Sequence, residues 1–457
     1  MTEFDPSPYQ AGVPTADTET STADTQPDAT VNRRHQVMVV VSMYIGYAMF
    51  MVLRMIPTVA GTSITDDPNL NVDTGDWGRI LAIGTIGALV GKFIGGYAAD
   101  KLGGRITFTI GLFVSAVGVL AFAASTAVWM FQATFFLALL AKSSGWPSMA
   151  KIIMTSFRPN EYGRVWGVLA TSSRIGTLVA TLLLGGMLAV ISWQTMLSIA
   201  GTAGIVITVY FAVSQKSAAG KLSVAMPNIA VGQDEISNEA AHPLYHTSLA
   251  EAILHFCQSR QFWLITGSMM GLTIMWDFLL LVPLYLRDTL NMTPSGASVA
   301  ASAFPFGSLI SVLVGGFVFD KLSRRSMAWV MGGMLLIAAG CILTFYLMPQ
   351  FGMSEEALVG LSLALLFMFG LCVSPCYYIP MSVFSIEFGG PHSGFLIALL
   401  DALAFGMTAA FYYFAGEVAE ESWTLFLLLL LIVAVWSMLT TFFFLLGETK
   451  KMGSEPA

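Results

Sequence analysis

Apolar stretches of about 20 residues recur along the chain from Val37 onward, and short polar breaks separate them. Each stretch is long enough to cross a hydrocarbon layer of ~30 Å as an α-helix, in which every backbone polar group is hydrogen-bonded. The predicted spans are residues 37–60, 77–99, 105–126, 129–152, 165–190, 193–214, 262–286, 297–319, 326–347, 357–381, 392–416 and 422–446. The sequence therefore predicts an all-α polytopic membrane protein with twelve transmembrane helices.

The spans form two groups of six, because a polar segment separates the sixth span from the seventh. The N-terminal run is rich in Thr, Asp, Pro and Ala, so it buries too little apolar surface to fold. The expected organisation is a disordered cytoplasmic tail (1–36), an N-terminal six-helix bundle (37–214), a cytoplasmic linker (215–261), a C-terminal six-helix bundle (262–446) and a second cytoplasmic tail (447–457).

The composition agrees with a membrane protein and argues against other classes. Hydrophobic residues make up 56% of the chain and charged residues only 11%, compared with about a quarter in ordinary soluble domains. This balance argues against a soluble enzyme, and the net charge of −7 argues against a nucleic-acid binder, which needs a basic face. The five histidines lie in the predicted tail, the linker or a loop, so we expect no enzymatic activity, no metal and no cofactor.

Basic residues predict which side of the membrane each loop occupies. With both termini inside, the predicted inner segments hold 15 of the 21 Lys and Arg residues, and the outer segments hold only Arg79 and Arg287. Short cytoplasmic loops are normally enriched in Lys and Arg, so this orientation is favoured. We therefore expect an integral protein of the inner or plasma membrane, embedded in the lipid bilayer with both termini in the cytoplasm.

An eight-residue motif occurs once in each predicted bundle. Residues 95–102 read GGYAADKL and residues 315–322 read GGFVFDKL, so the pattern GGxxxDKL recurs after 220 residues. Parallel repeats of six helices are typical of the major facilitator superfamily, and the motif resembles the signature loop of that superfamily. The resemblance implies two parallel six-helix bundles and a cytoplasmic gate formed by Asp100, Arg105 and Asp320. The glycines are expected to let two helices approach closely. The alternative is a helix-ending charge cluster without a gating role.

Six ionisable residues lie inside the predicted helices, where each charge costs about 2.5–3.5 kcal/mol unless a partner or a water-filled cavity compensates it. They are Arg54, Lys92, Lys142, Arg174, Asp277 and Asp401. All four cations belong to the first half of the chain and both carboxylates to the second. The cations favour a small anionic substrate, since Arg binds phosphate and carboxylate groups with two parallel hydrogen bonds. The alternative is that some cations are structural, with Arg174 paired to Asp401 or to the backbone and Lys142 bound to a backbone carbonyl.

Three further motifs lie on the first, second and fourth predicted helices. They are GYxxxxxxR at residues 46–54, KFIGG at residues 92–96 and GWP at residues 145–147. Together they are similar to motifs of the organophosphate:phosphate antiporters, which include glycerol-3-phosphate, hexose-phosphate and glucose-6-phosphate transporters, and the resemblance covers residues 35–450. It implies that Arg54 binds the substrate phosphate, that Lys92 lies nearby, and that Tyr47 lines the site.

The chain departs from that family at two positions. Trp276, followed by Asp277, stands where the family has a second phosphate-binding Arg, and Ser172 stands where it has a His. Arg174 is a candidate replacement for the missing Arg, although it lies about 200° around its helix from Ser172. The predicted substrate site comprises Tyr47, Arg54, Lys92, Lys142, Arg174 and Trp276. Asp277 and Asp401 are expected to act in coupling or as charge partners.

Three functions are compatible with these features. The first is a secondary active transporter that exchanges an organophosphate for phosphate while its two bundles rock about a central site. The second is a proton-coupled symporter of a sugar acid or another organic carboxylate, in which Asp277 or Asp401 carries the proton. The third is a transporter-like sensor that signals through its tail and linker. We expect the first, with a small anionic substrate, inorganic phosphate or protons as the second transported species, and the monomeric form that is usual in the family.

Overall fold

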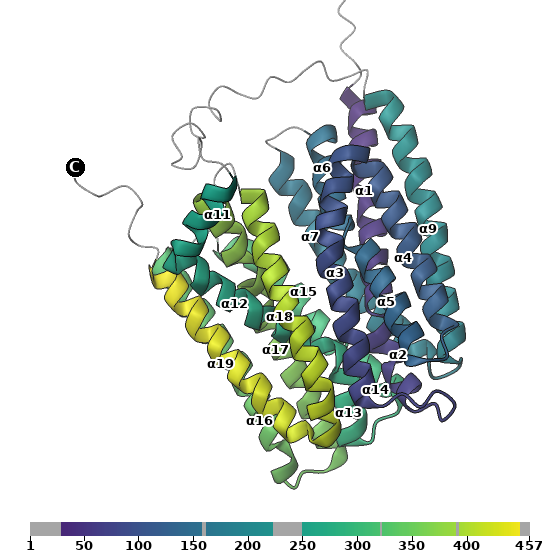
Figure 1. Ribbon diagram of the computed structural model, residues 1–457, viewed down its shortest axis with the longest axis vertical. Helices are drawn as coiled ribbons and strands as arrows, with labels where there is room; N and C mark the ends of the chain where they lie inside the picture. Colours follow the sequence, from purple (N-terminus) through teal and green to yellow (C-terminus); the bar gives the residue numbers. More distant parts are fainter. Residues whose placement is uncertain (1–28, 158–160, 223–248, 320–321, 390–392, 448–457) are drawn as a thin grey trace, which may run out of the picture.

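The computed structural model describes residues 29–157, 161–222, 249–319, 322–389 and 393–447. Every regular element within these ranges is helical (Figure 1). Eleven helical segments are long and apolar enough to cross a membrane. The predicted all-α polytopic membrane fold is therefore confirmed.

The first half of the chain contributes the helices coloured from purple through blue to teal in Figure 1. They are α1 (Ala29–Arg54), α2 (Ile56–Thr65), α3 (Thr74–Leu102), α4 (Gly104–Ala123), α5 (Val128–Lys142), α6 (Gly145–Ser156), α7 (Tyr162–Val179), the π-helix η2 (Ala180–Leu184), α8 (Gly185–Met187) and α9 (Trp193–Leu222).

The second half contributes the helices coloured green to yellow, preceded by a short teal helix. They are α11 (Leu249–Gln258), α12 (Arg260–Asp277), the 3₁₀-helix η3 (Phe278–Leu280), α13 (Val282–Leu290), α14 (Pro294–Ala300), α15 (Ala303–Phe319), α16 (Arg324–Leu347), the 3₁₀-helix η4 (Met348–Gln350), α17 (Glu355–Gly389), α18 (Ser393–Glu421) and α19 (Trp423–Gly447).

Four predicted spans are interrupted, and each interruption precedes a proline. The last helical residue and the proline that follows it are Arg54 and Pro57 for α1, Lys142 and Pro147 for α5, Asp277 and Pro283 for α12, and Ala300 and Pro305 for α14. Proline lacks an N–H group and its ring clashes with the carbonyl four residues earlier, so the helix is broken. The span predicted at 129–152 is consequently two shorter helices, α5 and α6, and it is not among the eleven. At three of the four breaks, a charged residue ends the helix.

Several helices are longer than predicted, among them α1 and α9. Helix α1 begins at Ala29 instead of residue 37, and α9 continues to Leu222 instead of ending at 214. A helix that has already formed gains one backbone hydrogen bond for each residue added, which carries it into polar sequence. Helix α11 begins at Leu249, inside the predicted linker. The remaining parts of the predicted tails and linker, residues 1–28, 223–248 and 448–457, lie outside the described residues.

The two halves lie side by side, with α3 and α18 adjacent at the centre of the molecule (Figure 1). Helix α7 packs against α15, and α2 packs against α13 and α14. The end of the molecule that carries α2 and α13 is called the acidic end below, because Asp66, Asp73 and Glu417 lie there. It lies at the bottom of Figure 1.

Polar contacts join the two halves at the acidic end. Arg287 of α13 forms an ion pair of 2.6 Å with Asp66, which follows α2. Arg79 of α3 forms an ion pair of 2.7 Å with Glu417 of α18. The hydroxyl of Ser298 in α14 donates a 3.0 Å hydrogen bond to a backbone carbonyl of α2. These contacts hold the two halves together at this end.

Helices α3 and α18 approach each other very closely at Gly78 and Gly416. A methyl group added at Gly78 would lie 2.6 Å from the Cα atom of Gly416 and 2.7 Å from the carbonyl oxygen of Tyr412. Backbone atoms cannot move aside as a side chain does, so this approach requires glycine. From this point the helices run in opposite chain directions, and they meet again at Lys92 and Asp401, ~21 Å farther along α3.

Candidate functional site

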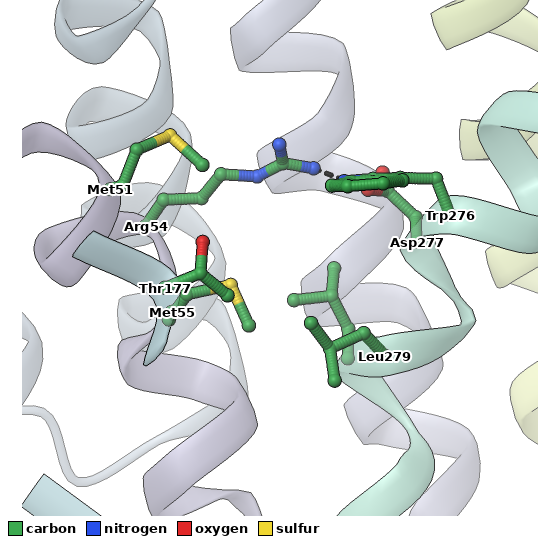
Figure 2. Close-up of a pocket in the computed structure, with 8 residues that line it drawn as sticks. Met51, Arg54, Met55, Thr177, Trp276, Asp277 and Leu279 are labelled. Atoms are coloured by element: carbon green, nitrogen blue, oxygen red, sulfur yellow. Dashed lines mark hydrogen bonds and ion pairs between the residues drawn. The ribbon is translucent and has the colours of Figure 1, made fainter. Parts of the chain in front are cut away.

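An ion pair joins the two halves where α1 and α12 end. The guanidinium group of Arg54 donates a hydrogen bond to the carboxylate of Asp277 (Figure 2). The Arg54 side chain is 12% exposed and that of Asp277 only 3%, so the pair is almost fully buried. Tyr412 fixes the backbone here, because its hydroxyl donates to the carbonyl oxygen of Asp277. The first long helix of each half thus ends in one member of a buried charge pair.

A second ion pair joins the halves between α3 and α18. The Nζ atom of Lys92 donates to the carboxylate of Asp401. The same Nζ atom lies 4.1 Å from the centre of the Phe405 ring, which is a cation–π contact. The Lys92 and Asp401 side chains are 24% and 18% exposed, so this pair is less buried than the first. Asp401 is therefore an ion-pair partner of Lys92.

Arg174 extends from α7 toward the second half. Its Cζ atom lies 5.0 Å from the centre of the Trp276 ring, and its Nη1 atom donates a 2.6 Å hydrogen bond to Ser173. Trp276 in turn stacks on Tyr377 of α17, with ring centres 5.6 Å apart and 24° between the planes. Trp276 occupies the position where the resemblance places a second Arg, and it is therefore in contact with Arg174 from the opposite half.

Lys142 and Tyr47 lie near the two ion pairs. Lys142 is partly buried and lies within electrostatic range of both pairs. Within the ranges that the structure describes, Lys142 forms no ion pair. Tyr47 is 7% exposed, packs against Trp146 with ring centres 5.6 Å apart, and lies within electrostatic range of Arg54. The residues predicted for the substrate site thus surround one region between the halves.

A small pocket lies beside the Arg54–Asp277 pair (Figure 2). Its lining residues are Met51, Arg54, Met55, Thr177, Trp276, Asp277, Leu279 and Leu280. The space open to water-sized molecules is only ≈ 10 Å³, which is about the minimum for one water molecule. A sugar-sized ligand therefore requires the ion pair and its surroundings to rearrange.

The first copy of the repeat motif lies at the end of α3 that is remote from the acidic end. Asp100 forms an exposed ion pair of 3.1 Å with Lys151 of α6, which belongs to the same half. Arg105 is partly buried in the first turn of α4. Asp320 lies outside the described residues. The gating role of these three residues stays a prediction.

The two glycines of this motif differ in their surroundings. A methyl group added at Gly95 would lie 2.6 Å from the Cα atom of Ser144, in the turn between α5 and α6. The same group at Gly96 would meet no atom within 4 Å among the described residues. The expected close approach of two helices therefore depends on Gly95, and the expectation is wrong for Gly96.

Sequence reasoning missed three side chains next to the charged groups. Thr177 follows Arg174 by three residues and Phe405 follows Asp401 by four, so each shares a helix face with its neighbouring charge. Tyr412 follows Asp401 by eleven residues, or about three helical turns, and lies on a similar face. A search at helical spacing from each membrane charge would have found all three, but not the backbone carbonyl that Tyr412 contacts.

The fold and the central charges define a membrane protein with two helical halves around a charged centre. Residues 43–411 match the family described as the Major Facilitator Superfamily. The chain therefore belongs to this superfamily of membrane transporters, as the repeat motif predicted.

Curated relatives agree with the more specific resemblance. A probable hexose phosphate transport protein of Chlamydia trachomatis is 24% identical over 62% of this chain, and the match covers 64% of that protein, slightly under two thirds of its length. The membrane sensor protein UhpC of Salmonella typhimurium is 24% identical over 69% of this chain and 71% of its own. A probable L-galactonate transporter of Escherichia coli is 26% identical over 67% of both chains. The predicted resemblance to organophosphate transporters is confirmed.

Solved structures support the fold. A bacterial homologue of the lysosomal transporter Spinster, in an inward-facing and unoccupied conformation, matches with a TM-score of 0.66 and 14% identity, over 89% of this chain and 97% of that chain. A D-xylose–proton symporter matches with a TM-score of 0.62 and 14% identity, again over 89% and 97%. At these identities the similarity concerns the fold alone.

Proposed function

We propose that this protein is a secondary transporter of a small organic anion, which exchanges an organophosphate for phosphate by alternating access. The observation that carries this proposal is an excess of basic groups between the halves, where four basic side chains (Arg54, Lys92, Lys142 and Arg174) gather around only two carboxylates, Asp277 and Asp401. A phosphate ester carries about −1.5 to −2 charges at pH 7 and complements this excess. The similarity to hexose phosphate transport proteins supports the same substrate class.

In this proposal, Arg54 is the main ligand of the phosphate group, because a guanidinium group offers two parallel N–H donors. Lys92 adds a second positive charge. Arg174, which lies against Trp276, contributes a second guanidinium group from the first half. Substrate binding displaces Asp277 from Arg54, which supplies the space that the small pocket lacks.

The rocker-switch motion follows from where the halves touch. While the contacts of Arg287 and Arg79 at the acidic end are formed, the central site is reached from the opposite end. When those contacts break and the halves tilt, the site opens toward the acidic end. By the distribution of basic residues, the acidic end faces away from the cytoplasm.

A second candidate is proton-coupled symport of an organic carboxylate. The observation that favours it is that both membrane carboxylates, Asp277 and Asp401, are held by cations of the other half. Protonation of either carboxylate would release its cation for a carboxylate substrate. The similarity to an L-galactonate transporter supports this candidate.

Purified protein in liposomes tests the first candidate. Liposomes loaded with phosphate are diluted into labelled phosphate, glycerol-3-phosphate or hexose phosphate, and label uptake is measured with and without internal phosphate. We expect uptake that is faster with internal phosphate than without it. Arg54→Lys should reduce it by about tenfold or more, because the bidentate geometry is lost. The matched control is Arg260→Lys, at an exposed position at the start of α12, and should leave uptake unchanged.

The remaining outcomes separate the alternatives. If no phosphate compound exchanges or competes, the antiporter proposal is wrong. Uptake of a sugar acid driven by a pH gradient would then establish the symporter. Saturable binding of a phosphate ester with no transport of any tested anion would identify a sensor, as the similarity to UhpC allows.

A further inference from the structure

The two charge pairs at the centre share one arrangement. In each pair the cation belongs to the first half and the carboxylate to the second, so each pair bridges the halves. Arg54 and Asp277 form the more deeply buried of the two pairs. Both pairs therefore lie between the halves, which is where alternating access places the substrate.

An anion site lined only by cations resists a conformational switch when it is empty. Unpaired cations in a low-dielectric region repel one another, and a membrane charge without a partner is costly. Such a carrier switches only when an anion is bound, which makes it an obligatory exchanger. Here Arg54, which lines the pocket, is paired with Asp277. Lys92, at the contact of α3 with α18, is paired with Asp401. Because both cations already have partners, this barrier is lowered.

The backbone of Asp277 is held in place by a hydrogen bond, whereas its side chain can rotate. Its backbone carbonyl accepts a hydrogen bond from Tyr412, and η3 begins at the next residue, ahead of the break at Pro283. The pocket lies directly beside the carboxylate (Figure 2). A rotation of the Asp277 side chain away from Arg54 would give an incoming anion access to the guanidinium group without moving α12.

We propose that Asp277 is a tethered substitute for the substrate anion. In the empty protein its carboxylate neutralises Arg54 from the opposite half, so the empty protein can switch and exchange is not obligatory. In the loaded protein the anionic group of the substrate takes the place of the carboxylate on Arg54. This inference rests on the proposed anion transport, and it adds net transport of the anion without a counter-substrate.

The arrangement has two measurable consequences. Net efflux from phosphate-loaded liposomes into phosphate-free medium requires the empty protein to switch back to the conformation that opens to the inside of the liposome. Exchange does not require this step. Asp277→Asn keeps the size of the side chain but removes its charge. The ratio of net efflux to exchange should therefore fall by at least about tenfold. A buried cation without a partner shifts the equilibrium between the conformations of the empty protein by more than that factor. The phosphate concentration that half-saturates exchange should fall as well, because the internal competitor is gone.

Two further variants complete the experiment. Asp277→Glu retains the charge and should keep a ratio near that of the wild type, which keeps the test informative if the Asn variant does not fold. Asp67→Asn removes a partly exposed carboxylate at the acidic end and should leave both rates unchanged. The probes are inorganic phosphate and glycerol-3-phosphate.

The outcomes distinguish this inference from the proposed function. Wild-type protein that exchanges phosphate but shows no net efflux would overturn the tethered-anion role and leave the transport function intact. An unchanged ratio in a folded Asp277→Asn variant would do the same. Absence of both exchange and efflux with either phosphate compound would instead contradict the proposed substrate class.

Discussion

The ion pairs at the centre and at the acidic end use the same chemical groups in different surroundings. Arg54 and Asp277 are 12% and 3% exposed, whereas Arg79 and Glu417 are 38% and 49% exposed. An exposed pair contributes at most about 1 kcal/mol, whereas removal of one partner from a buried pair costs about 3–5 kcal/mol. The Arg79–Glu417 pair can therefore separate at little cost, but the centre needs a replacement charge whenever a pair separates.

The largest expected effect is at the buried pair. Arg54→Gln leaves the carboxylate of Asp277 without its partner and should lower the free energy of unfolding by about 3–5 kcal/mol. The double variant Arg54→Gln/Asp277→Asn should recover most of this loss, because neither buried charge remains. The measurement is thermal unfolding of the purified protein in detergent, for the two single variants and the double variant as a double-mutant cycle. Additive losses would show that the two side chains are not coupled.

The second pair should give a smaller effect. Lys92→Gln removes the partner of Asp401 in a region where the side chains are 24% and 18% exposed, so water can partly solvate the remaining carboxylate. The expected loss is about 2–3 kcal/mol, near the lower range for a membrane charge. The same unfolding assay measures it. A loss greater than that of Arg54→Gln would contradict the expectation that the more deeply buried pair contributes more to stability.

The sequence predicts much of the central charge cluster but not its pairing. Helical spans, the segregation of cations and carboxylates and the repeat all follow from hydropathy and residue order. Whether Asp401 meets Lys92 or Arg174 depends on how α18 lies against α3, and tertiary packing between the halves decides this. The close approach of Gly78 and Gly416 is part of that packing, and no local pattern marks it.

The proline breaks could be predicted more fully than they were. Pro57, Pro147 and Pro283 each follow a membrane charge by three to six residues, and each interrupts a helix at or just after that charge. A proline at this distance frees backbone carbonyls beside the charge. Proline alone is not sufficient, however, because α17 continues through Pro375 and Pro380.

A third prediction concerns the close approach at the acidic end. Gly78→Ala places a methyl group 2.6 Å from the Cα atom of Gly416, which the backbone cannot accommodate without moving the helices apart. The conformation closed at the acidic end should lose about 1–2 kcal/mol, within the usual range for overpacking. A cysteine introduced by Thr74→Cys, at the start of α3, should then react faster with a membrane-impermeant maleimide. Gly96→Ala, at an open position, is the matched control, and equal reactivity in both variants would contradict the packing argument.

The smallest effect is expected at the exposed ion pair of the acidic end. Glu417→Gln removes one acceptor of Arg79, which keeps its second partner, Asp76, at 2.8 Å. The stability change should stay within about 1 kcal/mol, because water solvates both groups and salt screens them. Unfolding in detergent at low and high salt measures it, with Glu421→Gln at a neighbouring exposed position as control. A loss comparable to that of Arg54→Gln would mean that the acidic end stabilises the protein as strongly as its centre does, and that it cannot open cheaply during a transport cycle.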